Sequence, residues 1–312
     1  MNAQAALEEE DVKMMACASC GITGGDDITL KTCTACKSVR YCSVKCQKEH
    51  RPQHKKACKR RAAELRDEIL FKQPESFYRG DCPICCIPLP LDYSKTCMNS
   101  CCSKYICIGC HYANILREKE QKLQHACAFC RSPILTSEEE NNINCMKRVE
   151  ANDPVALNQM AMIKKGERDY KSAVEYLTRA IELGSIEAHY NLSVMYEKGH
   201  GVEKDEKKEL YHLECAVIGG HVLGRHNLGG LEEKNGRLDR ALKHWIIAAK
   251  LGHDHALISL NKACRDGLVS EQDFAAARRG HQKAVDATKS PQRELAEAAR
   301  QKAEAERAAM QK

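Results

Sequence analysis

The sequence predicts two small zinc-stabilised modules of the cross-brace type, followed by an all-α solenoid of helix-hairpin repeats. The first observation is that seven of the 20 cysteines lie within residues 17–58, ten within 82–130 and three beyond. The second is a glycine-centred similarity that recurs every 32–36 residues after residue 150. The third is the scarcity of large aromatic residues, with four Phe and one Trp in 312 residues. Stability must therefore come from metal in the first half and from packed aliphatic helices in the second.

The composition favours an intracellular protein, cytoplasmic or nuclear. Residues 1–11 have neither the basic start nor the apolar run of a secretory leader, and no run of about eighteen apolar residues predicts a membrane span. In a reducing compartment, clustered cysteines indicate metal ligands before disulfides. The net charge of +6 is modest, and the basic cluster at residues 55–61 is better explained as a solvated face than as a nucleic-acid contact or a localisation signal. We expect protein partners rather than nucleic acid or membrane.

Residues 17–58 contain eight potential zinc ligands in four pairs. Two Cys-x2-Cys pairs are followed by a Cys-x3-Cys pair and by a His-x3-Cys pair that would lie on one face of a helix. Pairs one and three would share one ion, and pairs two and four the other. The expected ligands are Cys17, Cys20, Cys33, Cys36, Cys42, Cys46, His54 and Cys58.

This series resembles the MYND zinc finger over its whole length, including the Tyr41-Cys42 run and the ending from His54 to Cys58. The resemblance implies a module that binds short, often proline-containing peptides and performs no chemistry. His54 rather than His50 has the family's spacing to the last cysteine. Arg51 departs from the family, which commonly has a tryptophan of the peptide groove there.

A helical linker is predicted over residues 59–81. Residues 59–70 are rich in helix formers, with apolar positions at Leu65, Ile69 and Leu70, and Pro74 ends the helix.

Residues 82–133 contain three further Cys-x2-Cys pairs. Each pair has the spacing that lets two thiolates bind one zinc ion from a tight turn. The pairs are Cys82 and Cys85, Cys107 and Cys110, and Cys127 and Cys130. The opening Cys-Pro-Ile-Cys run resembles a RING finger, whose cross-brace implies that pairs one and three share an ion and that a helix lies near residues 111–124.

The remaining pair of this second module departs from the RING pattern. Cys102 fits that pattern, but Lys104 stands where a histidine ligand is usual, and a lysine is not a normal zinc ligand. Cys101 is the preferred partner of Cys102 and Cys97 is the alternative, which leaves Cys86 spare. We therefore expect about four zinc ions per chain, two in each module, and each site contributes ~10–16 kcal/mol of apparent binding energy.

The RING resemblance also implies a surface that holds a ubiquitin-conjugating enzyme. Such modules contribute no nucleophile and act by positioning the loaded enzyme. The matching residues are Ile84 between the first two ligands, Arg131 after the last ligand, and Pro133. Ala128 departs, since a proline commonly follows the seventh ligand. Ile84 is equally compatible with a role as a core residue of the zinc loop. Arg131 is equally compatible with a role as a solvated surface arginine.

Helical repeats are predicted over residues 151–286. Gly184, Gly220 and Gly252 are separated by 36 and 32 residues in similar surroundings, and an earlier copy begins at Asn152. About four copies of a two-helix unit at this period indicate a solenoid. The Gly-His-Gly-Val run at 199–202 resembles the loop of the Sel1-like repeat, a tetratricopeptide relative. Residues that could line a concave binding face are His189, Tyr190, Asn191, His226 and Asn227.

The tail at residues 287–312 is predicted to be a charged, exposed helix that starts at Pro291 and frays, because it lacks the apolar heptad of a coiled coil. The complete pattern predicts a RING-type ubiquitin ligase, in which the second module recruits a conjugating enzyme and the repeats bind a substrate. The alternative is a non-catalytic adaptor that uses its zinc fingers only for protein–protein interaction. A hydrolase or cysteine-nucleophile enzyme has little support, and no residue is assigned a catalytic role.

Overall fold

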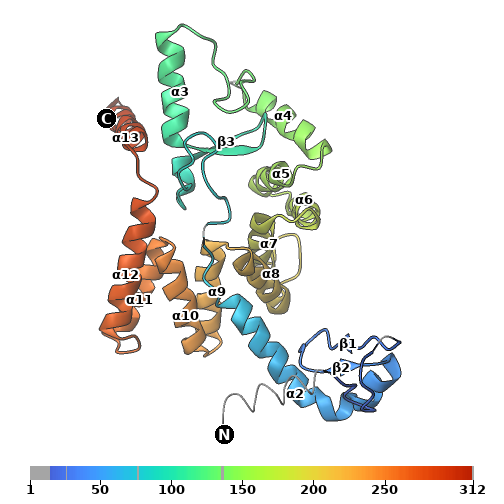
Figure 1. Cartoon of the computed structure of the whole chain (residues 1–312). Coiled ribbons are helices and arrows are strands. Elements are labelled where there is room, and N and C mark those ends of the chain that lie inside the picture. The colour runs from blue at the N-terminus through green and yellow to red at the C-terminus, as the bar shows by residue number, and fades with distance from the viewer. Residues whose placement is uncertain (1–14, 26, 76, 135–136, 311–312) are drawn as a thin grey trace. The chain divides into compact units, whose positions relative to one another are not determined.

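A computed structural model of the chain describes residues 15–25, 27–75, 77–134 and 137–310 (Figure 1). Residues 1–11, on which the leader argument rests, lie outside this part. The chain divides into two compact units, Met1–Lys72 and Gln73–Lys312, which are described separately. Among the described residues, no helix combines the length and the apolar character that crossing a bilayer requires.

The first unit has very little regular structure apart from one long helix. β1 (Lys31–Thr32) pairs antiparallel with β2 (Arg40–Tyr41), and α2 (Val44–Leu70) follows. The Ser43 hydroxyl caps α2 by accepting a hydrogen bond from the N–H of Cys46. The predicted linker helix is thus the second half of α2, which begins fifteen residues earlier than expected, at Val44 instead of 59, and ends at Leu70 as predicted.

The second zinc module, residues 82–133, opens the second unit. A short 3-10 turn η1 (Tyr93–Lys95) leads into β3 (Thr96–Asn99), which pairs antiparallel with β4 (Lys104–Cys107), and α3 (Ile108–Glu120) follows. α3 begins before the predicted residue 111 because the Cys107 thiol caps it by accepting from the N–H of Cys110. Leu89 and Ile106 are buried among the cysteines.

After α4 (Glu138–Glu150), four helix pairs pack in sequence. They are α5 (Pro154–Gly166) with α6 (Tyr170–Glu182), α7 (Ile186–Lys198) with α8 (Glu206–Ile218), α9 (Val222–Lys234) with α10 (Leu238–Lys250), and α11 (Asp254–Arg265) with α12 (Glu271–Asp286). Buried alanines let neighbouring helices approach closely: Ala156, Ala188 and Ala256 occupy equivalent positions in the first helix of three pairs.

The second glycine of the Gly-x-Gly-Val loop, Gly201, is required for steric reasons. Gly201 has a φ of +71°, and a Cβ atom there would lie 2.4 Å from the carbonyl oxygen of Tyr170. Only glycine satisfies both conditions, because other residues rarely adopt this φ and would collide with the preceding repeat. The loop therefore sets the spacing between two consecutive helix pairs.

Residues 77–93 pack onto the repeats. The Tyr78 ring stacks on His221, which stacks in turn on Tyr190, with ring centroids 4.9 and 4.3 Å apart. The Tyr93 hydroxyl donates to Glu187 at 2.7 Å. Part of the face predicted to bind partners, around Tyr190, is thus covered by the protein's own chain.

Arg79 lies in the same contact region with its side chain only 3% exposed. Its guanidinium sits 3.6 Å from the Tyr93 ring centroid and 4.6 Å from that of Tyr105, and 3.6 Å from the Glu187 carboxylate. Burying this charge is possible because aromatic faces and a carboxylate surround it.

The C-terminal helix α13 (Pro291–Met310) packs against α3. Arg293 and Ala296 are buried, whereas residues 301–310 are exposed. The prediction of an exposed helix is therefore wrong for its first turns. Its amphipathic pattern is weak because an arginine and an alanine, rather than large apolar residues, make the contact.

Candidate metal centres

Four groups of side chains bring potential metal ligands together, and in each group the ligand atoms lie within 4.8 Å of one another. Each zinc module holds two groups, built from interleaved ligand pairs. The groups are Cys17/Cys20/Cys42/Cys46, Cys33/Cys36/His54/Cys58, Cys82/Cys85/Cys107/Cys110 and Cys101/Cys102/Cys127/Cys130. These are the sixteen residues that the sequence predicts as ligands, in the predicted combinations.

The distances within the groups suit zinc. The Sγ–Sγ separations include 3.6 Å for Cys42–Cys46, 3.8 Å for Cys85–Cys107 and 3.9 Å for Cys102–Cys127. Two thiolates bound to one tetrahedral zinc at ~2.3 Å lie ~3.8 Å apart, whereas a disulfide would need ~2.05 Å. All cysteines in the described part of the chain are free. Four closed sets of soft ligands fit about four zinc ions, as predicted.

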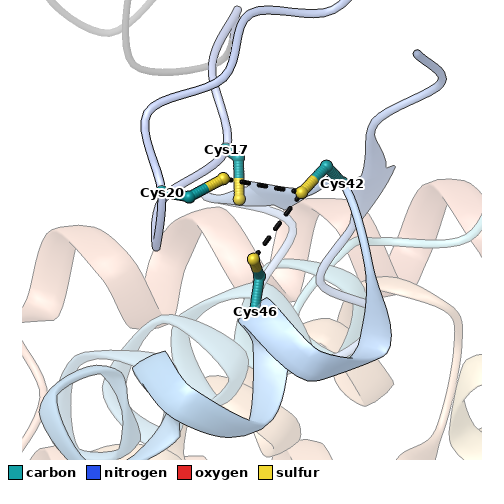
Figure 2. A group of neighbouring side chains, drawn as sticks. All are labelled: Cys17, Cys20, Cys42 and Cys46. Carbon is teal, nitrogen blue, oxygen red and sulfur yellow. Dashed lines mark hydrogen bonds between the residues drawn. The ribbon is translucent and has the colours of Figure 1, made fainter.

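Figure 2 shows how the first group is assembled from three places in the sequence. Cys17 and Cys20 come from the opening loop, Cys42 follows β2, and Cys46 lies on the first turn of α2. Cys20 and Cys42 approach to 3.6 Å between their sulfur atoms. The capped start of α2 thus fixes the fourth ligand.

In the second group, α2 supplies two ligands, His54 and Cys58, and the His54 Nε2 lies 3.3 Å from the Cys36 sulfur. His50 instead has its Nδ1 3.1 Å from the Tyr41 hydroxyl, and its ring stacks on His54 with centroids 5.6 Å apart. His50 therefore supports the orientation of His54, consistent with the predicted choice between the two histidines.

A recurrent turn positions four of the five Cys-x2-Cys pairs, the exception being Cys107 and Cys110 at the start of α3. The residue after the second cysteine has a positive φ, and its N–H donates to the carbonyl of the first cysteine. This geometry occurs with Gly21, Lys37, Cys86 and Arg131, at N–O distances of 2.8–2.9 Å. We name it the cysteine turn. Three of these four residues are not glycine, so ligand binding must offset a backbone cost of order 1 kcal/mol or more each.

The irregular pair of the second module uses the same turn without its first cysteine. Ser103 has a φ of 56°, and its N–H donates to the carbonyl of buried Asn99 at 2.8 Å. Asn99 therefore occupies the place of the first ligand, and Cys101 joins Cys102 instead. Cys97 belongs to β3 and packs against the core near Ile106.

In each group, one cysteine thiol has a lowered pKa. A hydrogen bond from the Cys107 thiol lowers the pKa of Cys82 to about 4 despite burial. Burial would raise the pKa of Cys17, but backbone hydrogen bonds outweigh it and lower that pKa to about 6. Burial is likewise outweighed at Cys130 by hydrogen bonds with Ser132, giving a pKa of about 6. The pKa of Cys36 is also lowered: burial would raise it, but hydrogen bonds from Ser38 outweigh this. A first thiolate is therefore favoured in every group, which is the form that binds metal.

The predicted enzyme-contact residues lie on the surface. Ile84 is 41% exposed, and Arg131 and Pro133 are also exposed. Arg131 donates to Asn114 of α3 at 3.0 Å, which ties the last cysteine turn to that helix. Phe129, inside the last Cys-x2-Cys pair, is likewise 41% exposed and was not singled out by the sequence. Phe129 directly precedes the second cysteine of its pair, as Ile84 does in the first pair of this module. That equivalent position could have identified it from the sequence.

Two known families match parts of the chain. Residues 17–58 match the MYND finger, and residues 154–185, 186–221 and 222–253 each match the Sel1 repeat. The predicted MYND finger and Sel1 repeats are therefore confirmed. No curated protein matches the chain.

Two solved structures are similar to part of the chain. One is a Sel1 repeat protein from Oxalobacter formigenes, 18% identical, covering 57% of this chain and 74% of that one, with a TM-score of 0.43. The other is c5321, a protective antigen of uropathogenic Escherichia coli with an SLR fold, 20% identical, covering 62% of this chain and 40% of that one, with a TM-score of 0.39.

A MYND finger joined to Sel1 repeats defines the chain as a zinc-containing, multi-module protein of protein–protein interaction.

Proposed function

We propose that the protein is a RING-type ubiquitin ligase that acts inside the cell. Its second zinc module would recruit a ubiquitin-conjugating enzyme, and its repeats would bind the substrate. The observation that carries this proposal is the interleaving of two metal groups within residues 82–130, which resembles the RING cross-brace. A module of this kind accelerates transfer by restraining the enzyme–ubiquitin thioester in a reactive geometry, so the absence of an assigned nucleophile is consistent with it.

The exposed residues at the first and last cysteine turns of the second module support the contact with a conjugating enzyme. Ile84 is an apolar side chain that its cysteine turn holds at the surface, although apolar side chains of this size are usually buried. Arg131 uses one hydrogen bond to Asn114, which leaves further guanidinium donors for a partner. Pro133 extends this exposed surface.

For the substrate, the repeats offer a hollow of about 600 Å³ between α7, α8 and α9. Its lining includes two residues predicted for the binding face, His226 and Asn227, together with Tyr196 and Glu197. The region around Tyr190 is covered by Tyr78 through the His221 stack, so this hollow is the better place for a partner.

The test is discharge of ubiquitin from loaded conjugating enzymes by the full-length zinc-loaded protein. Ile84→Ala and Arg131→Ala should each slow discharge about tenfold or more, the effect of losing a central interface contact. Ile258→Ala is the matched control, since Ile258 is an exposed isoleucine of the repeats. Equal activity of the wild type and Ile84→Ala would refute the proposal.

The alternative is a non-catalytic adaptor with three interaction modules. It is favoured by the departures of the second module from the RING pattern: Asn99 in place of a ligand, Lys104 in β4, and Ala128 buried inside the last turn. No discharge with any conjugating enzyme, together with retained binding of a protein partner by the repeats, would favour the adaptor.

A further inference from the structure

The docked C-terminal helix lies directly against the third ligand pair of the second zinc module. Gly109 is one of the two residues between Cys107 and Cys110. A Cβ atom at this position would lie 2.8 Å from the backbone nitrogen of Arg293 and 2.9 Å from the carbonyl carbon of Gln292. The backbone at the start of α13 can therefore approach the metal-binding segment only because this residue is glycine. Such close approach indicates a built contact between the helix and the metal group.

Arg293 makes that contact specific. Its guanidinium donates to the carbonyls of Pro88 at 2.7 Å and Ile87 at 3.0 Å, the residues that follow the first cysteine turn. It also donates to the Cys85 sulfur at 3.5 Å. The Arg293 side chain thus contacts the first ligand pair, and its backbone lies against Gly109 of the other pair. The group formed by Cys82, Cys85, Cys107 and Cys110 is here named the inner zinc site.

Charge explains why an arginine is used. Arg293 is 7% exposed, and burying a cation is costly unless an opposite charge accompanies it. Four thiolates and one Zn²⁺ carry a net charge of about −2, so the loaded site supplies that charge. Without metal, the loop at Ile87 and Pro88 loses its anchor, and the two carbonyls that Arg293 binds there are no longer held in place.

The helix has further contacts beyond Arg293 along the same face. Glu297 pairs with Lys95 at 3.3 Å, and Arg300 donates to the carbonyl of Ser94 at 3.0 Å. Residues 293, 297 and 300 are three or four positions apart and so share one side of the helix. Ile84 remains 41% exposed with α13 docked, so the helix leaves that surface open.

We propose that α13 is a metal-dependent latch, in which Arg293 is an outer-shell partner of zinc at the inner zinc site. Docking of the helix and binding of the metal stabilise each other, because a contact that favours the loaded site must raise its affinity by the same factor as metal favours docking. The proposal rests on zinc in this group and is independent of any ligase activity.

The first experiment measures zinc release from the full-length, zinc-loaded protein to a chromogenic chelator. In Arg293→Ala, one of the four ions should be released about 10–100-fold faster, the usual effect of losing an outer-shell partner. Arg293→Lys keeps the charge but not the forked geometry, so its effect should be intermediate. Arg307→Ala is the control, on the exposed end of the same helix, and should match the wild type.

The second experiment follows hydrogen exchange of residues 291–300. Protection should fall in Arg293→Ala that still contains all four ions, and in wild type after chelation. Ala296→Glu, which should undock the helix without touching the metal loop, should accelerate zinc release in the same way and serves if Arg293→Ala does not fold. Unchanged release in both variants, or equal protection of this segment with and without metal, would overturn the proposal.

Discussion

The two zinc modules use the same cysteine turn but differ in what surrounds it. In the first module, the buried core consists of Cys17, Cys33, Cys36 and Tyr41, so three of its four members are metal ligands. The second module adds Leu89 and Ile106 to its core, and Arg79 and Arg293 connect it to other parts of its unit. Metal alone can define a fold of this size, whereas holding a module against repeats requires additional protein contacts.

The largest expected effect is on the first module. Cys33→Ser should remove a ligand of a site worth ~10–16 kcal/mol, and hydrogen-exchange protection of residues 17–58 should disappear while the repeats stay protected. Cys110→Ser is the matched variant, because both cysteines are buried ligands. It should lose zinc but retain protection around Ile106. Equal loss of protection in the two modules would show that the second module depends on metal as completely as the first.

A second prediction concerns the irregular ligand pair. Cys101→Ser should lower the zinc content from about four ions to about three, whereas Cys97→Ser should leave it unchanged, because only Cys101 lies in a metal group. Native mass spectrometry measures both. Loss of an ion from Cys97→Ser with full occupancy in Cys101→Ser would reverse the assignment.

The smallest of the three effects concerns the contact between the second module and the repeats. Arg79→Ala should destabilise the second unit by about 3 kcal/mol, because it removes a buried cation from aromatic faces and leaves Glu187 without that partner. Urea unfolding followed by circular dichroism measures this change. Arg265→Ala, at an exposed position of α11, should change stability by less than about 0.5 kcal/mol. A similar small change for both variants would mean that Arg79 does not join the module to the repeats.

Local patterns were predictable from the sequence and long-range contacts were not. The spacing of the cysteines follows from the geometry of a turn, so the ligand pairs were predictable from the sequence. The period of the repeats follows from the length of a helix pair, and the family matches agree with it. Both depend on residues close together in the sequence.

The Arg79 contact and the docking of α13 depend on residues far apart in the sequence. Cys101 was the preferred partner of Cys102, but the turn geometry behind that choice is visible only in the structure. Asn99 is identifiable as a substitute for a ligand only once Ser103 is known to have a positive φ. Arg79 is surrounded by aromatic rings from positions 77 to 105 and by Glu187. For α13, the sequence shows an alanine-rich charged helix, and its contact depends on the missing side chain of Gly109.

The position of the second module has a mechanical consequence for the repeats. An array of helix pairs can normally bend along its length, since each pair contacts only its neighbours. Here Ser100 of the module bonds to Asn141 of α4 at 3.0 Å, and Arg293 bonds the module to α13. Both ends of the array therefore contact the same zinc module, which restricts how far the array can bend. A partner of the repeats would meet a surface of fixed curvature, and little binding energy would be spent on shaping it.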